Sequence, residues 1–328
     1  MQQQRYDFLD IAKGIVILWV VWMHMEMPMY IWPCFQMPFF FFISGTLYKQ
    51  PTIEKTGVWL KNKAFTLLVP AITFMFIVFV IKCLQKEDAF IEGTIVNKLQ
   101  IVYSGSIIWF LQAMFIFICA HYVIVRWLKR KLAGMLITML IYPIGYYMYA
   151  NKLDQIPCFA LSSILIFWMY FELGCLLGRN YTLITDSNKK YQRIVSAIIA
   201  TIFIVTVCTP ELNELCFRRL FGGKNILVPI YMPIFNLCVI YLVMLFSYNI
   251  EKIKFSSLWK FYGVNSIVIY LTHLLIYVNI VKPWIENGLN RFLGYVMVVL
   301  MSTICIYFFN NCCPIFIGKK KNKLINKL

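Results

Sequence analysis

Six ionisable residues stand inside long apolar stretches of this 328-residue sequence. An ionisable side chain is costly wherever water is excluded, so each of the six is a candidate for ligand binding or proton transfer. Histidine is the side chain best suited to move a proton near neutral pH, and lysine can hold an anion as a point charge. The six residues are Asp10, Lys13, His24, Glu26, Glu172 and His273.

The first apolar stretch, LDIAKGIVILWVVWMH, contains three of these residues. Lys13 and His24 are 11 residues apart, which is close to three helical turns. A helix would therefore present both on one face, about 16 Å apart along its axis, with Asp10 one turn before Lys13. Two simpler interpretations stay open. Asp10 and Lys13 could form an interfacial ion pair, and His24 could donate a hydrogen bond to a neighbouring helix.

A second polar stripe lies in FYGVNSIVIYLTHLLIY, near the end of the chain. Ser266, Tyr270 and His273 are spaced i, i+4 and i+7, so a helix would carry them on one face. Asn265 stands at the expected start of that helix, where it could act as a cap. The alternative is that these groups only join helices by hydrogen bonds. Two histidines on facing stripes favour a shared polar cavity.

Three further residues are candidates for lining such a cavity. Ser44 precedes Gly45 in QMPFFFFISGTLY, where small residues allow another backbone to approach closely. Trp109 stands where an interfacial anchor is the ordinary interpretation. Glu172 is either protonated, paired or lining a wet cavity.

The composition shows what kind of elements must position these residues. Hydrophobic residues make up 61 % and charged residues 14 % of the chain, and the mean hydropathy is +0.73. A soluble domain carries about 25 % charged residues, so this composition excludes a soluble protein. We predict an all-α polytopic membrane protein with about ten transmembrane helices, because no segment alternates like a barrel strand. The ten spans centre on Leu9–Met27, Phe35–Tyr48, Ala64–Leu84, Ile107–Val125, Leu132–Tyr149, Phe159–Leu177, Ile194–Cys208, Ile226–Phe246, Val264–Val281 and Phe292–Asn310.

The basic residues predict an orientation. The formal net charge is +17, and more than twice as many Lys and Arg residues fall on the side of the termini as on the other side. The positive-inside rule therefore puts both termini in the cytoplasm. The same rule explains the positive net charge, so the charge does not indicate a nucleic-acid partner. No internal repeat or linker is visible, so residues 1–328 are expected to form one membrane domain.

Several chemistries have no signature in the sequence. The 11 cysteines include no CxxC pair and lie mostly in apolar stretches, so they indicate neither a disulfide framework nor a metal site. No Walker motif, GxGxxG loop or HExxH motif is present. We therefore expect no bound metal, and a reaction driven by its substrate or by a gradient.

The motifs together resemble acyltransferase family 3, whose members are multi-pass membrane proteins. The first and last stripes resemble the family's first-helix motif, a basic residue and a His separated by ten residues, and its Gly-x-Asn-Ser…Tyr…His segment. Four further segments resemble family motifs in the same order along the chain: QMPFFFFISGTLY, KNKAFTLLVP, IIWFLQAMF and FELGCLLG. Two positions depart from the family pattern: Lys13 stands where Arg is frequent, and Gln36 where His is frequent.

The resemblance implies transfer of an acyl group, most often acetyl, from cytoplasmic acyl-coenzyme A to a hydroxyl of a cell-surface glycan or its lipid-linked precursor. It implies His24 as general base, with Asn265, Ser266 or His273 steadying the oxyanion or orienting the imidazole. Lys13, Lys61 and Lys63 would hold the phosphates of the co-substrate. The expected partners are acyl-coenzyme A, the glycan acceptor and membrane lipids, and the expected location is the bacterial inner membrane.

The alternative function is a polytopic flippase or exporter of a polysaccharide or lipid-linked glycan, which would also need polar stripes between helices. An inverted internal repeat would favour that function, and none is visible.

Overall fold

The structure is a computed structural model. It describes residues 6–25, 27, 35–85, 92–106, 108–151, 153, 160–185, 189–209 and 228–320. Glu26 lies outside these residues. Every regular element among them is helical, which confirms the predicted all-α membrane fold.

Each of the ten predicted spans corresponds to a helix or a run of helices. The ranges are α1 Asp7–His24, α2 Gln36–Thr46, α3 Thr56–Gln85, α6 Trp109–Leu128, α7 Lys131–Ala150, α8 Leu161–Leu177, α10 Lys189–Cys208, α12 Val228–Ile250, the run α14 Ser266–Ile276, η3 Tyr277–Val281 and α15 Lys282–Glu286, and α16 Arg291–Asn311. The short η1 (Ile53–Lys55), α9 (Thr182–Thr185) and η4 (Pro314–Ile317) complete the described elements, together with α5 and α13 below.

Among the described residues, seven helices or helix runs are long and apolar enough to cross a membrane. They contain α3, α6, α7, α10, α12, α14 to α15, and α16. The other three predicted spans differ in length or charge. α1 carries Asp7, Asp10 and Lys13 within 18 residues, α2 has 11 residues, and α8 has 17. The count of ten spans and the cytoplasmic termini therefore stay predictions.

Two helices lie where the sequence suggested loop. α5 (Ile95–Ser106) follows α3, and α13 (Ser256–Val264) precedes α14. Their sequences are IVNKLQIVYSGS and SSLWKFYGV. Both are too short and too polar to be predicted as membrane-spanning helices. Tertiary packing is what makes such short helices stable.

The chain divides into two compact units, each built from distant parts of the sequence. The first comprises Met1–Tyr48, Val123–Gln155 and Leu161–Ser266, and the second comprises Lys49–Tyr122, Ile156–Ala160 and Ile267–Leu328. The expected single domain 1–328 stays a prediction.

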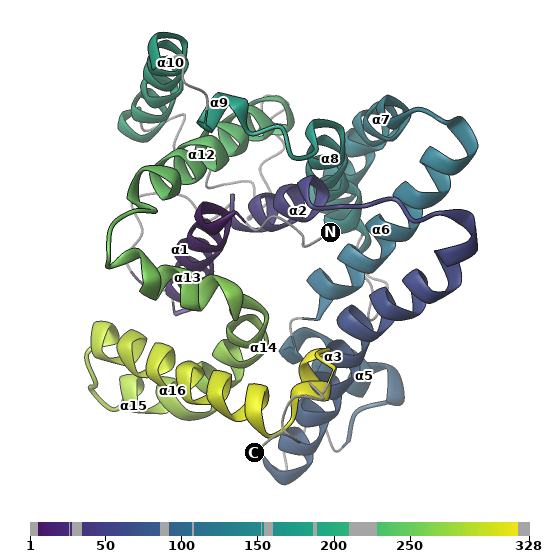
Figure 1. Ribbon diagram of the computed structural model, residues 1–328. Helices are drawn as coiled ribbons and strands as arrows, with labels where there is room; N and C mark the ends of the chain where they lie inside the picture. The colour runs from purple at the N-terminus through teal and green to yellow at the C-terminus, as the bar shows by residue number, and fades with distance from the viewer. Residues whose placement is uncertain are drawn as a thin grey trace, which may run out of the picture. The chain divides into compact units, whose positions relative to one another are not determined.

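In the first unit, α8 packs against both α2 and α7 (Figure 1). Glycines allow the close contact with α2, because a Cβ atom on Gly45 would overlap the Phe171 carbonyl oxygen and one on Gly174 would overlap the Phe42 carbonyl oxygen. α1 packs most extensively on α13 and also contacts α12. Small residues at such crossings are how membrane helices approach without a hydrophobic driving force.

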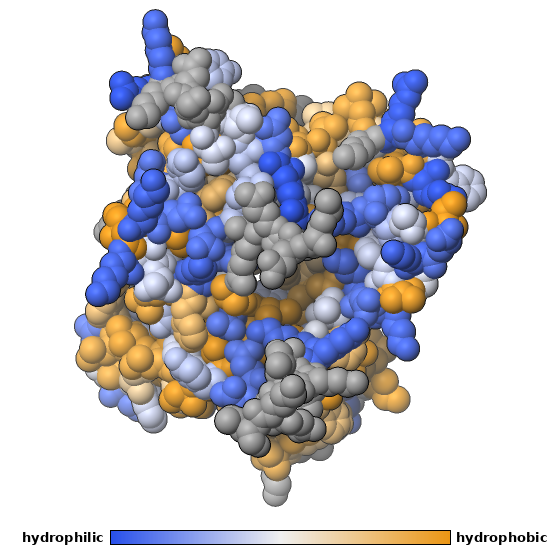
Figure 2. Space-filling model, in the orientation of Figure 1, coloured by the Kyte–Doolittle hydropathy of each residue, from blue (hydrophilic) through white to orange (hydrophobic). Residues whose placement is uncertain are grey.

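In the second unit, α3 packs against α5, and η4 lies along α3 (Figure 1). Phe74 of α3 and Phe309 of α16 have ring centroids 5.6 Å apart. Figure 2 shows apolar side chains gathered over α16. Leu300 and Ile304 are among the exposed apolar side chains of this helix. An exposed apolar helix face is expected of a segment surrounded by lipid.

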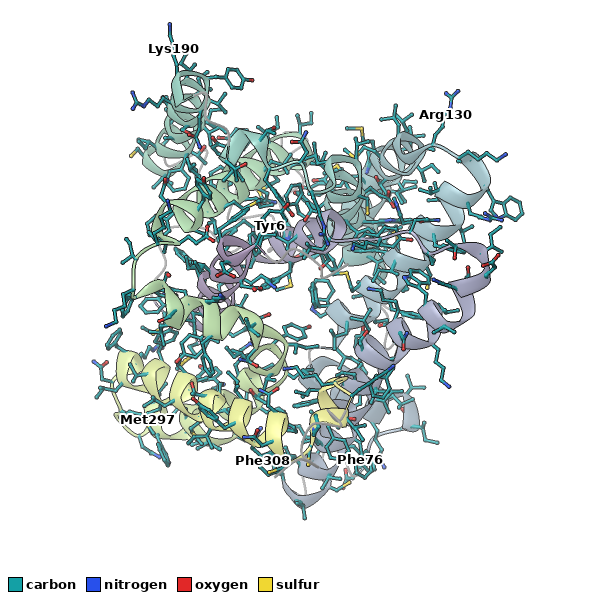
Figure 3. The ribbon with its side chains drawn as sticks, in the orientation of Figure 1. Tyr6, Phe76, Arg130, Lys190, Met297 and Phe308 are labelled. Atoms are coloured by element: carbon teal, nitrogen blue, oxygen red, sulfur yellow. The ribbon has the colours of Figure 1, made fainter. Side chains whose placement is uncertain are left out.

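Individual side chains show the same division between apolar faces and charged ends (Figure 3). Phe76 on α3 and Phe308 on α16 are exposed apolar residues of the second unit. Arg130, at the start of α7, and Lys190, at the start of α10, extend away from the first unit.

Candidate functional site

The stripe on α1 is one uninterrupted helix from Asp7 to His24, so Lys13 and His24 lie on a single helix as predicted. His24 is the last helical residue and is half-buried. At about 1.5 Å per residue, the two residues are about 16 Å apart along the axis. The helix therefore separates a cation from an imidazole by a fixed distance.

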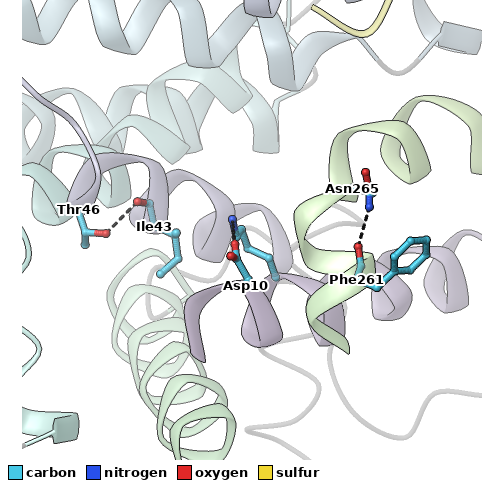
Figure 4. A network of polar contacts seen from close by, with 6 residues as sticks. Asp10, Ile43, Thr46, Phe261 and Asn265 are labelled. Carbon is cyan, nitrogen blue, oxygen red and sulfur yellow. Dashed lines mark hydrogen bonds and ion pairs between the residues drawn. The ribbon is translucent and has the colours of Figure 1, made fainter. Parts of the chain in front are cut away.

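The ammonium group of Lys13 forms an ion pair with Asp10, whose Oδ1 lies 2.6 Å from Nζ (Figure 4). The two side chains are 23 % and 6 % exposed. The structure therefore shows the ion pair that the simpler interpretation expected, and its place at the membrane interface stays a prediction. An ion pair that is largely withdrawn from water is held tightly, because separating it would leave an uncompensated charge.

The partner of α1 is α13, and glycines make their backbones touch. A Cβ atom at Gly14 would overlap the Trp259 carbonyl oxygen, and one at Gly263 would overlap the Asp10 carbonyl oxygen. Lys260 of α13 adds an ion pair with Asp7, 2.5 Å between Nζ and Oδ2. Sequence reasoning missed Lys260, although its place three residues before Gly263 marks the α1-facing turn of α13.

Asn265 lies between the end of α13 and the start of α14. It ends α13, and its Nδ2 donates to the Phe261 carbonyl oxygen at 3.0 Å (Figure 4). The reason is that α13 is a separate helix whose last carbonyl groups need partners. The expected cap at the start of the ninth span stays a prediction. Ser266, the next residue, begins α14 and is half-buried.

The second stripe lies on α14, where Tyr270 and His273 are both buried and their ring centroids are 6.4 Å apart. The Nδ1 atom of His273 lies 2.8 Å from the Ile269 carbonyl oxygen. A carbonyl oxygen only accepts, so Nδ1 donates the proton of this hydrogen bond. The Phe110 ring packs on Tyr270 at 5.3 Å.

Trp109, the residue before Phe110, begins α6 and is half-buried. Gln112 lies three residues after Trp109 on α6, and its Oε1 accepts a hydrogen bond from the Tyr103 hydroxyl at 2.9 Å. The sequence reasoning did not single out Tyr103 or Gln112, because neither stands in a recognisable spacing with the histidines.

Glu172 is fully buried at the contact between α8 and α7. The Trp168 indole donates to its Oε1 at 2.9 Å. Its carboxyl group also packs on Gly134, where a Cβ atom would lie 2.7 Å from the Glu172 Cδ. Of the alternatives left open, the structure therefore supports a partnered carboxyl group at a helix contact.

Ser44 is half-buried on α2, one residue before the glycine that contacts α8. Two residues further, Thr46 is tied to the loop after α8, since the Tyr181 hydroxyl donates to its Oγ1 at 2.9 Å. Burial raises the pKa of the Tyr181 phenol, so the group donates as a neutral hydroxyl at neutral pH.

Lys61 and Lys63 lie in the first turns of α3, the former exposed and the latter half-buried. They belong to the second unit, with Trp109, Tyr270 and His273. Asp10, Lys13, His24, Ser44, Glu172, Asn265 and Ser266 belong to the first. The facing arrangement of the two histidine stripes stays a prediction.

Comparison with known proteins gives one match. The family model of the acyltransferase domain of acyltransferase family 3 matches residues 6–311, nearly the whole chain. No curated protein and no solved structure matches. The matched region includes both stripes and all the helices that position them. The chain therefore belongs to acyltransferase family 3, a family of membrane acyltransferases.

Proposed function

We propose that this protein is a membrane O-acyltransferase that moves an acyl group, most often acetyl, from cytoplasmic acyl-coenzyme A to a hydroxyl of a cell-surface glycan or its lipid-linked precursor. The proposed location is the bacterial inner membrane. The observation that carries the proposal is α1, which fixes a cation and a histidine about three turns apart in a chain of this family.

His24 is the proposed general base. Its imidazole takes the proton of the acceptor hydroxyl as the hydroxyl oxygen attacks the thioester carbonyl. The new C–O bond forms, the C–S bond breaks, and the thiolate of coenzyme A receives the proton from the imidazolium. A thioester is already activated, so the reaction needs no ATP.

Lys13, Lys61 and Lys63 are the proposed ligands of the co-substrate's phosphate groups. Lys13 is held by Asp10, so its ammonium would have to be shared between the carboxylate and a phosphate. Lys61 and Lys63 carry no ion pair with a carboxylate of the described residues. Asn265, Ser266 and His273 are proposed to steady the developing oxyanion or orient His24.

The test is acyl transfer by purified protein in nanodiscs, with isotope-labelled acetyl-coenzyme A and a mixture of lipid-linked sugars. We expect His24→Ala to slow transfer by about 10²- to 10⁴-fold, the usual contribution of a general base. His121→Gln is the matched control, because His121 is a buried histidine of α6 with no assigned role. A His24→Ala protein that is folded and transfers at the wild-type rate would refute the role of His24.

A further inference from the structure

The end of the described chain folds back onto α3. After α16, the short helix η4 (Pro314–Ile317) lies along α3, as the yellow segment beside α3 shows in Figure 1. The backbone then turns at Gly318, whose φ of 69° is in the left-handed region. The Lys319 amide closes this turn by donating to the Pro314 carbonyl oxygen at 2.9 Å. The turn determines where the next lysines lie.

Two contacts fix this turn on α3. A Cβ atom at Gly318 would lie 2.7 Å from the Thr66 carbonyl oxygen, so the turn touches the α3 backbone. The Lys320 ammonium donates to Asn62 Oδ1 at 3.0 Å. Asn62 and Thr66 are one turn apart, and Lys63 stands between them in sequence. The C-terminal segment therefore brings its cations to the turn of α3 that already carries two lysines.

We name these four residues, Lys61, Lys63, Lys319 and Lys320, the α3 lysine cluster. Neutral amides hold two of the ammonium groups, since Lys319 Nζ donates to Asn310 Oδ1 at 2.6 Å and Lys320 Nζ donates to Asn62. Within the described residues, no carboxylate forms an ion pair with any of the four. Burial also lowers the pKa of the Lys319 ammonium. Like charges that lie near one another repel, and a bound anion would relieve that repulsion.

We propose that the α3 lysine cluster is a binding site for phosphate groups, and that Lys319 and Lys320 complete the site that Lys61 and Lys63 begin. Ammonium groups on two segments can surround a phosphate with charge-assisted hydrogen bonds. The assignment to the phosphates of the acyl donor rests on the proposed function. The phosphate of an anionic lipid is the other source of the same chemistry. The tethering of Lys319 and Lys320 to side-chain amides favours a built site over side chains that merely extend toward lipid headgroups.

The test measures binding of coenzyme A, dephospho-coenzyme A and pantetheine to the full chain in phosphatidylcholine nanodiscs. The variant is Lys319→Gln with Lys320→Gln. We expect its affinity for coenzyme A to fall by about tenfold or more, because two charge-assisted contacts are lost, and its weak binding of pantetheine to stay unchanged. The matched control is Lys252→Gln with Lys254→Gln, an exposed basic pair between α12 and α13, which should keep wild-type affinity.

A second arm adds phosphatidylglycerol to the nanodiscs. If the variant loses enrichment of phosphatidylglycerol around the protein but binds coenzyme A like the wild type, the phosphate comes from lipid and the donor assignment is wrong. If neither coenzyme A binding nor lipid enrichment changes, the site itself is wrong. His24→Ala separates this inference from the proposed function. That variant should bind coenzyme A normally, so a wild type that binds coenzyme A through the cluster but transfers no acyl group would refute only the function.

Discussion

Two lysines of the first unit and the α3 lysine cluster of the second unit have different partners. Lys13 and Lys260 each lie within 2.6 Å of an aspartate oxygen. The α3 lysine cluster of the second unit has amide partners at Lys319 and Lys320, and no ion pair with a described carboxylate. A lysine paired with a carboxylate has its charge compensated within the protein, whereas one held by neutral groups keeps its charge for a ligand. The difference supports the proposal that the α3 lysine cluster binds phosphate.

The largest effect on the free energy of unfolding is expected where the backbones of α1 and α13 touch. Gly14→Ala places a Cβ atom on the Trp259 carbonyl oxygen, so α1 and α13 must separate. We expect a loss of about 3 kcal/mol or more in the free energy of unfolding. The measurement is unfolding of the purified protein in detergent by heat or denaturant.

Gly57→Ala is the control for this substitution, because a Cβ atom there meets nothing within 4 Å. It should be neutral or stabilise α3 by up to about 1 kcal/mol. Equal behaviour of the two variants would mean that the α1–α13 contact does not organise the first unit.

The next largest effect on stability is expected at the Asp10–Lys13 ion pair of the first unit. Asp10→Asn removes the carboxylate from a pair whose side chains are 6 % and 23 % exposed and leaves the Lys13 ammonium uncompensated. We expect a loss of about 2 kcal/mol in unfolding free energy. Asp7→Asn is the control, since the Asp7–Lys260 pair is 40 % and 38 % exposed and such pairs contribute less than about 1 kcal/mol.

The same Asp10→Asn protein also tests whether the lysines of the two units differ in their ability to bind phosphate. If it binds coenzyme A more tightly than the wild type, Lys13 is available for phosphate once its aspartate is gone, and the division between the two units is not strict. An unchanged affinity for coenzyme A would mean that Lys13 has a structural role only.

The smallest effect on stability is expected at the turn that docks the C-terminal lysines. Gly318→Ala forces an alanine into the left-handed region, which costs about 1–2 kcal/mol, and overlaps Thr66. We expect the segment to leave α3, so coenzyme A affinity should fall as in the double lysine variant.

Gly178→Ala in the first unit separates backbone strain from docking. Its φ is 58°, so the alanine is strained in the same way, but no atom lies within 4 Å of the new Cβ. Its coenzyme A affinity should match the wild type. A matching decrease in both variants would attribute the effect to general destabilisation and not to docking of the lysines.

The sequence by itself determined the class of the protein and the place of its main helices. A helix satisfies its own backbone groups where water is excluded, and each of the ten predicted segments is helical. Among the described residues, seven helices or helix runs are long and apolar enough to cross a bilayer. The spacing of Lys13 and His24 fixed their common helix, because the helical repeat is a local property. The family could also be predicted from the sequence, and its model matches residues 6–311.

Only the tertiary structure decided which polar groups pair. Asn265 caps the end of α13, because a short helix forms there by packing on α1. The Glu172 carboxyl group packs on Gly134 of α7. Lys320 reaches Asn62 across 258 residues of sequence. Such partners depend on which helices touch, and the close helix contacts are set by glycines whose neighbours no local pattern names.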